Sequence, residues 1–319
     1  MADDDVDLDL VRASAREFLA ERGVKDSVKD LAAMDWTGLL VDESMGGVGW
    51  RPVETCVVAE ELGRAQDASA WFGTTMGAAA LASAPEKVRE ELLPGLLSGS
   101  SAAGFAIADD FARVIRGDLI DFAFLLDRKG IHLLGDLSPR HFVRDGDLLD
   151  VSRTVWRTDF DLASGELIGS PDRAAELLSV ARLLISADSV GAVSMTLERL
   201  TAYLRERVAF GAPIASFQAV QHRLVELLVF VVKARAVIMR AARAIAVADA
   251  RASVLTAAAH AFVAAKSTAA VDECMQLSGG IGFTWEYPLH HELRRVFTNA
   301  HLMGTARSCR ELLANVSGW

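Results

Sequence analysis

The sequence predicts a mainly α-helical fold with a small β insert: an N-terminal helical domain, a short middle β domain and a C-terminal four-helix bundle. Three observations lead to this prediction. Apolar residues follow helical spacing up to about residue 100, short apolar runs replace that spacing up to about 170, and long helical patterns with few breakers follow. We therefore expect domain boundaries at 1–100, 101–170 and 171–319.

Composition narrows the class of protein. The chain has 319 residues, of which 51% are hydrophobic, and 43 acidic against 33 basic residues give a net charge of −10. This share of hydrophobic residues is enough to form a large core. We do not expect non-specific nucleic-acid binding, because it depends on an excess of Lys and Arg. The three cysteines have neither metal-ligand nor disulfide-framework spacing, so we predict no metal and a reducing, cytoplasmic setting.

No membrane span or secretory leader is predicted. The first nine residues are rich in Asp, whereas a secretory signal needs a basic start and an apolar run. The most apolar stretch, Leu224 to Met239, contains three charged residues and is shorter than the ~20 residues that a bilayer span needs. A buried amphipathic helix explains it better.

In the N-terminal third, Leu31 to Val41 has the pattern of a helix. The glycine-rich loop Met45 to Gly49 ends it. Pro52 suits the first turn of a further helix to Leu62, with Gly63 as its expected stop.

In the middle segment, Gly104 to Ala108, Phe122 to Leu126 and Ile131 to Leu134 are short apolar runs that predict strands. Asp127 to Gly130 joins the last two runs as a hairpin turn. In the final segment, we expect three long helices over Asp172 to Val208, Phe217 to Ala248 and Arg251 to Leu277. Such lengths are typical of a helical bundle.

Two motifs in the last segment carry chemistry. Arg207 to Ile214 offers a planar cation and an aromatic ring, both suited to a phosphate-containing cofactor, and Phe217 to His222 follows. Gln276 to Phe283 holds three glycines, which let backbone approach a ligand. The alternatives are structural: Arg207 could cap its helix, and one glycine could be an ordinary C-cap.

In order and spacing, these motifs resemble those of the acyl-CoA dehydrogenases, as do Trp36 to Leu39, Glu43 to Gly49 and Glu60 to Arg64. The resemblance implies an FAD cofactor and desaturation of an acyl-CoA thioester, in which a carboxylate takes the α proton and the flavin takes the β hydride. By the same resemblance, the cofactor-binding residues are Arg207, Phe210, Phe217, Gln276, Gly279, Gly280 and Thr305.

The base expected from the family is missing. The commonest family position for the catalytic Glu is occupied by Met303, and the alternative position falls at Ala181. Neither side chain can accept a proton from carbon. Asp188 and Glu198 are nearby carboxylates, which we expect to be paired or exposed rather than displaced bases.

The middle domain is short and lacks the flavin-holding loop of relatives, with Ala106 to Asp110 in its place. The resemblance therefore implies one subunit of a heteromeric (α2β2) enzyme that completes the flavin site of a homologous partner carrying the Glu. Known enzymes of this kind act on steroid side-chain CoA esters. Three alternatives remain: a homotetramer with Glu286 or Glu292 as base, a flavin-free scaffold, and a flavin enzyme with another outcome.

Overall fold

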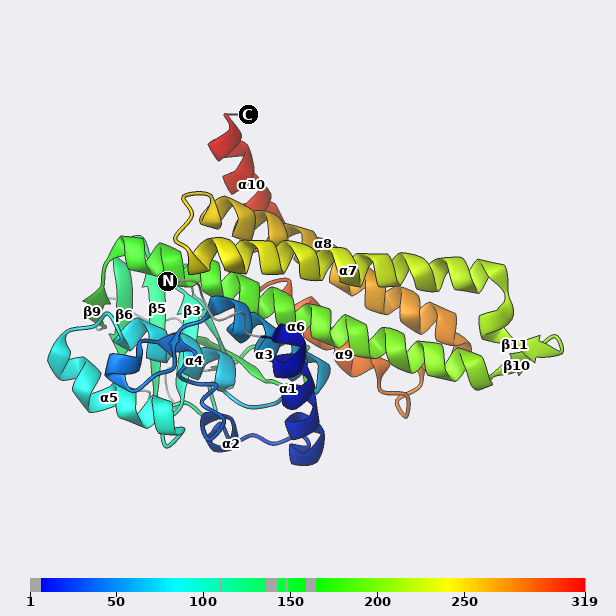
Figure 1. The fold of residues 1–319 in the computed structure, drawn as a ribbon, viewed down its shortest axis with the longest axis horizontal. Coiled ribbons are helices and arrows are strands. Elements are labelled where there is room, and N and C mark those ends of the chain that lie inside the picture. The colour runs from blue at the N-terminus through cyan, green and yellow to red at the C-terminus, as the bar shows by residue number, and fades with distance from the viewer. Residues whose placement is uncertain (1–6, 110, 136–142, 147–148, 159–164, 319) are drawn as a thin grey trace.

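The predicted fold class is confirmed. The computed structural model describes residues 7–109, 111–135, 143–146, 149–158 and 165–318. Three long helices, α6, α7 and α8, lie side by side, and the strands and the N-terminal helices lie along the first part and the middle of α6 (Figure 1). The other end of the long helices projects away from that body and carries a small hairpin, β10–β11.

The N-terminal part is helical with one short strand pair. Its elements are α1 (Leu8–Arg22), α2 (Lys29–Ala32), β1 (Leu40–Val41), η1 (Glu43–Met45), β2 (Gly49–Trp50), α3 (Pro52–Arg64), α4 (Trp71–Leu81) and α5 (Glu86–Ser98).

The helix predicted over Leu31 to Val41 is wrong. Helix α2 ends at Ala32, and Asp35 adopts a left-handed φ of 60° that turns the chain toward β1. The carbonyl of Trp36 accepts a hydrogen bond of 3.1 Å from the Trp71 indole. Long-range bonding of this backbone has overridden a local helical spacing.

Gly63 does not end α3 as predicted, because the helix continues to Arg64. A Cβ at Gly63 would lie 2.0 Å from the carbonyl oxygen of Asp188, and one at Gly191 would lie 1.9 Å from that of Glu60. The two glycines let α3 and α6 cross with their backbones in contact, which no larger residue would allow.

The middle part contains two small sheets. Strands β3 (Ala103–Ile107), β5 (Phe122–Asp127), β6 (Gly130–Leu134) and β9 (Glu166–Gly169) form one in the order β3-β5-β6-β9, with β3 and β5 parallel. Strands β4 (Ala112–Ile115), β8 (Val155–Thr158) and β7 (Val143–Arg144) form the other in the order β4-β8-β7. The three predicted strands are confirmed, as is the hairpin: Asp127 pairs with Gly130 and accepts amide hydrogen bonds from Lys129 and Gly130.

The last part confirms the three long helices to within two residues at each end. They are α6 (Pro171–Glu206), α7 (Gln218–Ala246) and α8 (Ala252–Ser278), linked through β10 (Val208–Ala209), β11 (Ala212–Pro213) and η3 (Ile214–Ser216). After α8 come η4 (Gly279–Phe283), α9 (Leu289–Asn299) and α10 (Ala306–Ser317).

Two segments have the length and hydropathy of a membrane span, Pro171–Glu206 and Ala252–Phe283. Within the protein, 89% of the most apolar window of the first and 50% of that of the second are buried. Helix α6 is thus covered by its neighbours, as a core helix is. The three cysteines are free and buried.

Candidate functional site

The β10–β11 hairpin and the start of α7 present two of the predicted cofactor-binding residues. Phe210 stands at its tip with a φ of 54° and is 99% exposed, while Phe217, where α7 begins, is 37% exposed. Their ring centroids are 6.4 Å apart with the planes nearly perpendicular. Arg207, just past the end of α6, is also exposed, and none of the ion pairs in the described part of the chain involves it. An exposed guanidinium beside two exposed rings is suited to an anionic, aromatic ligand.

The end of α8 carries the second set. Gln276 is exposed in the last turn, and Gly279 has a φ of 67°, so it also ends the helix. A Cβ placed on Gly279 or Gly280 would meet no atom within 4 Å. One on Gly282 would lie 2.3 Å from the carbonyl oxygen of Met275, so packing alone explains that glycine. Packing does not explain Gly280, whose open backbone leaves room for a ligand.

The two sets lie at the same end of the bundle. Helices α6 and α8 run in the same direction, and both finish beside the hairpin (Figure 1). The Tyr203 ring in the last turn of α6 lies 5.9 Å from that of Tyr287, which follows η4, and Arg223 in α7 pairs with Glu273 in α8. The residues present therefore fit a dinucleotide with a pyrophosphate: a cation, exposed rings and unobstructed glycine backbone.

Thr305, the seventh predicted residue, lies elsewhere. It caps the N-terminus of α10, where its hydroxyl accepts a hydrogen bond of 3.1 Å from the amide of Ser308. Thr305 also lines a crevice of about 340 Å³ between the β strands and the turn before α10. The other lining residues are Ile107, Asp109, Phe111, Arg113, His301, Leu302, Met303, Gly304 and Ser308.

Met303 faces this crevice from a backbone that is fixed on both sides. It has a φ of 56° and is 4% exposed. Arg182 donates to its carbonyl at 3.0 Å, and His260 Nε2 is 2.9 Å from the carbonyl oxygen of Gly304. Burial lowers the pKa of His260, which favours the neutral ring as the donor to that carbonyl. The turn at which the sequence predicts the family base is therefore held on both sides, and it presents a thioether.

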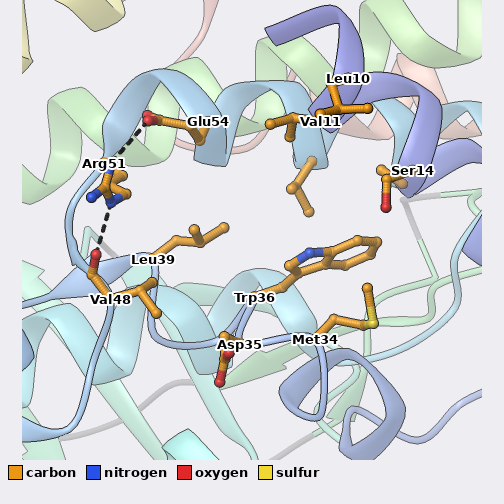
Figure 2. A pocket seen from close by; sticks show the side chains of 12 residues that line it. Leu10, Val11, Ser14, Met34, Asp35, Trp36, Leu39, Val48, Arg51 and Glu54 are labelled. Carbon is orange, nitrogen blue, oxygen red and sulfur yellow. Dashed lines mark hydrogen bonds and ion pairs between the residues drawn. The ribbon is translucent and has the colours of Figure 1, made fainter. Parts of the chain in front are cut away.

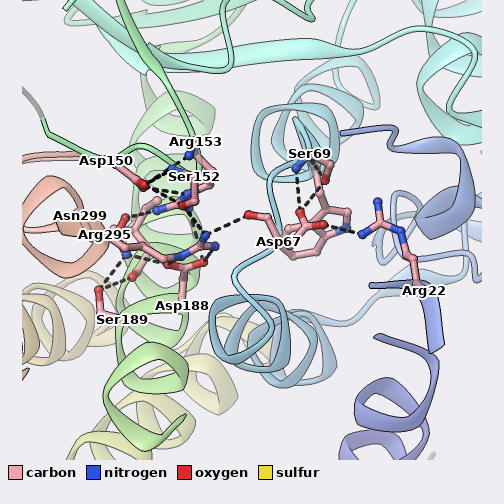
Figure 3. A network of polar contacts seen from close by, with 12 residues as sticks. Arg22, Asp67, Ser69, Asp150, Ser152, Arg153, Asp188, Ser189, Arg295 and Asn299 are labelled. Carbon is pink, nitrogen blue, oxygen red and sulfur yellow. Dashed lines mark hydrogen bonds and ion pairs between the residues drawn. The ribbon is translucent and has the colours of Figure 1, made fainter. Parts of the chain in front are cut away.

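Ala181 is fully buried in α6 among apolar side chains. One candidate for a displaced base, Asp188, lies two turns further on in a buried polar cluster (Figure 3). Its carboxylate accepts hydrogen bonds from Arg295 at 2.9 and 2.5 Å and from Asn299 at 2.6 Å. Burial alone would raise the pKa of Asp188, but Arg153 and Arg295 outweigh it and hold the pKa below its usual value. Asp188 is a structural anion, as expected.

The other carboxylates are no better placed. The Glu198 carboxylate accepts a hydrogen bond of 2.5 Å from Arg64 where α3 and α6 meet. Burial alone would raise the pKa of Glu198, but the Arg64 guanidinium outweighs it and lowers that pKa. Glu292 is fully buried and pairs with Arg199, while Glu286 is exposed in the loop after η4. None of these three lines the crevice beside Met303.

Sequence reasoning missed the two residues that hold the Met303 turn. Arg182 is 121 positions before Met303, and His260 is 44 before Gly304. No local motif marks either residue, because their partners are backbone carbonyls that only the fold brings near.

A helical N-terminal part, a small β part and a bundle of long helices are combined in the same way in a known class of proteins, the acyl-CoA dehydrogenases. Residues 7–100 match the acyl-CoA dehydrogenase N-terminal domain, and residues 172–317 match the acyl-CoA dehydrogenase C-terminal domain. The chain is 31% identical over 300 residues to the acyl-CoA dehydrogenase IpdE2 of Mycobacterium tuberculosis, covering 92% of this chain and 88% of that protein. IpdE2 of Mycolicibacterium smegmatis is 32% identical over 281 residues, covering 87% and 83%. The chain belongs to the acyl-CoA dehydrogenase family, an oxidoreductase family that uses FAD.

Solved structures share this fold at lower identity. The Tcur3481-Tcur3483 steroid ACAD superposes with a TM-score of 0.84 at 21% identity, covering 98% of this chain and 97% of that one. The ChsE4-ChsE5 complex from Mycobacterium tuberculosis gives a TM-score of 0.80 at 18% identity, covering 98% and 97%.

Proposed function

We propose that this chain is the base-lacking subunit of a heteromeric FAD-dependent acyl-CoA dehydrogenase. Its exposed bundle end completes the FAD site of a homologous partner, and that partner supplies the catalytic Glu. One contrast carries the proposal. Arg207, Phe210, Gln276 and Gly280 are retained and exposed, while Met303 stands where a proton acceptor is needed.

The similar proteins support a two-chain assembly. The ChsE4-ChsE5 structure is a complex of two named proteins, and Tcur3481-Tcur3483 is described as a steroid ACAD. We extend both features to this chain: an α2β2 assembly in the cytoplasm and, as substrate, a CoA thioester of a steroid side chain or related acyl group.

Each retained residue has a role in this proposal. FAD supplies the hydride acceptor when bound. The Arg207 guanidinium pairs with the pyrophosphate, because its planar fork matches two phosphate oxygens. Phe210 and Phe217 cover the cofactor from water, and Gly279 and Gly280 admit its ADP part against the backbone. The chain thus orients a cofactor whose chemistry occurs next to the partner's carboxylate.

Coexpression with a homologous subunit that has the Glu tests the proposal. We expect this chain alone to hold no FAD and the complex to hold FAD and desaturate an acyl-CoA. Arg207→Gln should lower the FAD content of the complex, whereas Arg310→Gln, an exposed arginine on α10, should not. Replacing the partner's catalytic Glu by Gln should abolish turnover with FAD retained.

Two results would contradict the proposal. The first is a yellow homo-oligomer of this chain alone that desaturates an acyl-CoA. The second is a complex with the partner in which no acyl-CoA bleaches the flavin, which would favour a non-catalytic scaffold or a regulatory role for this chain.

A further inference from the structure

A second cavity lies wholly within the N-terminal part of the chain. It has a volume of about 430 Å³ and is bounded by the first half of α1, the turn between α2 and β1, and the start of α3 (Figure 2). It shares no lining residue with the crevice beside Met303, and none with the bundle end. Its volume falls in the ~300–1,000 Å³ range of small-molecule sites.

The lining is mostly apolar, with a buried floor and an open rim. Trp36 is 7% exposed at the floor, with Leu39 and Ala15 buried near it, while Leu10 on the rim is 67% exposed. An apolar molecule that covered this floor and rim would be stabilised, because binding would remove apolar surface from water.

Side-chain contacts beside the cavity hold its walls in fixed positions. Arg12 and Arg16 tie α1 to α3 through the buried carboxylates of Glu60 and Glu61, with bonds of 2.9–3.0 Å. The Trp36 ring packs edge-on against Phe18 at 5.3 Å between centroids. These contacts fix both helix and floor, so the cavity is a preformed one rather than a loosely packed region.

The polar groups around the cavity are mainly hydrogen-bond donors. Arg51 donates a hydrogen bond of 2.8 Å from Nε to the carbonyl of Val48 and makes a longer one of 3.4 Å to the Glu54 carboxylate. Within the described part of the chain, three of its five N–H groups are then free to donate to a ligand. Among the described hydrogen bonds, none uses the Trp36 indole N–H or the Ser14 hydroxyl. Figure 2 shows Arg51 and Glu54 at one end of the cavity and Ser14 at the other, with the Trp36 ring between them.

Acceptors are few. The Glu54 carboxylate is already engaged by Arg51, and the Asp35 carboxylate points away from the Trp36 ring (Figure 2). We propose that this cavity is a ligand site for an apolar molecule that carries an oxygen acceptor, such as a carboxylate or a ketone. Its hydrocarbon body lies on Trp36, and its oxygen accepts from Arg51 or Ser14.

Three probes with the same ten-carbon body test the chemistry. Titration calorimetry on the full chain should show saturable binding of decanoate and 2-decanone, each below its aggregation concentration. Decylamine, which offers only donors and a positive charge, should bind about tenfold more weakly or worse, the factor that one good hydrogen bond provides. Equal binding of decylamine, or no saturable binding of any probe, overturns the proposal.

Two matched variants test the location. Ser14→Trp adds an indole at an exposed position on the cavity wall and should weaken decanoate at least about tenfold. Ala13→Trp adds the same group at the preceding position, which is also exposed but does not line the cavity. This variant should bind decanoate as the wild type does. Arg51→Gln should weaken decanoate more than 2-decanone. If Ser14→Trp keeps its thermal midpoint and binds decanoate normally, the ligand lies elsewhere.

Discussion

Arg295 in α9 donates two hydrogen bonds to the Asp188 carboxylate in α6, from Nε to Oδ1 at 2.9 Å and from Nη2 to Oδ2 at 2.5 Å. A third bond from Arg295 reaches the carbonyl of Asp67 after α3. The pair therefore joins the last helices to the N-terminal part, through a cluster that also takes in Arg153 from the middle segment (Figure 3). This cluster therefore bonds the N-terminal, middle and C-terminal parts of the chain to one another.

Asp188→Asn should destabilise the chain by about 3–5 kcal/mol, because the buried Arg295 guanidinium loses its anion and Arg153 keeps only Asp150. The folded-state pKa of Asp188 is lowered, so its contribution is present above the unfolded value of about 4 and is lost as pH falls through the folded value. Urea unfolding at pH 7 measures the effect, with Glu206→Gln, an exposed carboxylate, as the control. Equal midpoints for the two variants would contradict the ion-pair role.

Two glycines of one motif should respond differently to alanine. Gly282→Ala places a Cβ 2.3 Å from the Met275 carbonyl oxygen and should lower the thermal midpoint of the chain alone. Gly280→Ala meets no atom, so it should leave that midpoint unchanged and lower the FAD content of the complex with the partner. Differential scanning fluorimetry and flavin absorbance separate the two effects. Loss of stability with Gly280→Ala would assign that glycine to packing.

Long helices, three strands and one hairpin could be predicted because their signals are local: apolar period, few breakers and a turn of Asp and Gly. The turn at Asp35 and the role of Gly63 could not, since each depends on a contact with a distant segment, Trp71 or Asp188. The same division holds at the site. The Arg207 and Gln276 motifs are contiguous in sequence, whereas the support of Met303 by Arg182 and His260 exists only in three dimensions.

His260 should make stability fall on mild acidification. Burial lowers the folded-state pKa of His260 below its unfolded value of about 6.5. The neutral ring therefore contributes fully to the free energy of unfolding above about pH 6.5, and this contribution is lost as the pH falls below that value. Between pH 7 and 5, the thermal midpoint of His260→Gln should fall less than that of the wild type, although it starts lower. His222→Gln, an exposed histidine, should keep the wild-type slope. Parallel slopes for His260→Gln and the wild type would show that His260 does not titrate there.

Met303→Glu places a carboxylate where the resemblance predicts the family base, and it tests whether the crevice can otherwise support catalysis. We expect no second activity, because the family resemblance implies a flavin-holding loop where this chain has Ala106 to Asp110. The new carboxyl would replace a thioether that is 4% exposed, and its desolvation should lower the free energy of unfolding by about 1–3 kcal/mol. In the complex, kcat and FAD content should therefore stay at wild-type values, as they should for Met303→Leu, which keeps the site apolar. A rise in both FAD content and kcat with Met303→Glu alone would mean that this chain retains a complete site of its own and lacks only the base.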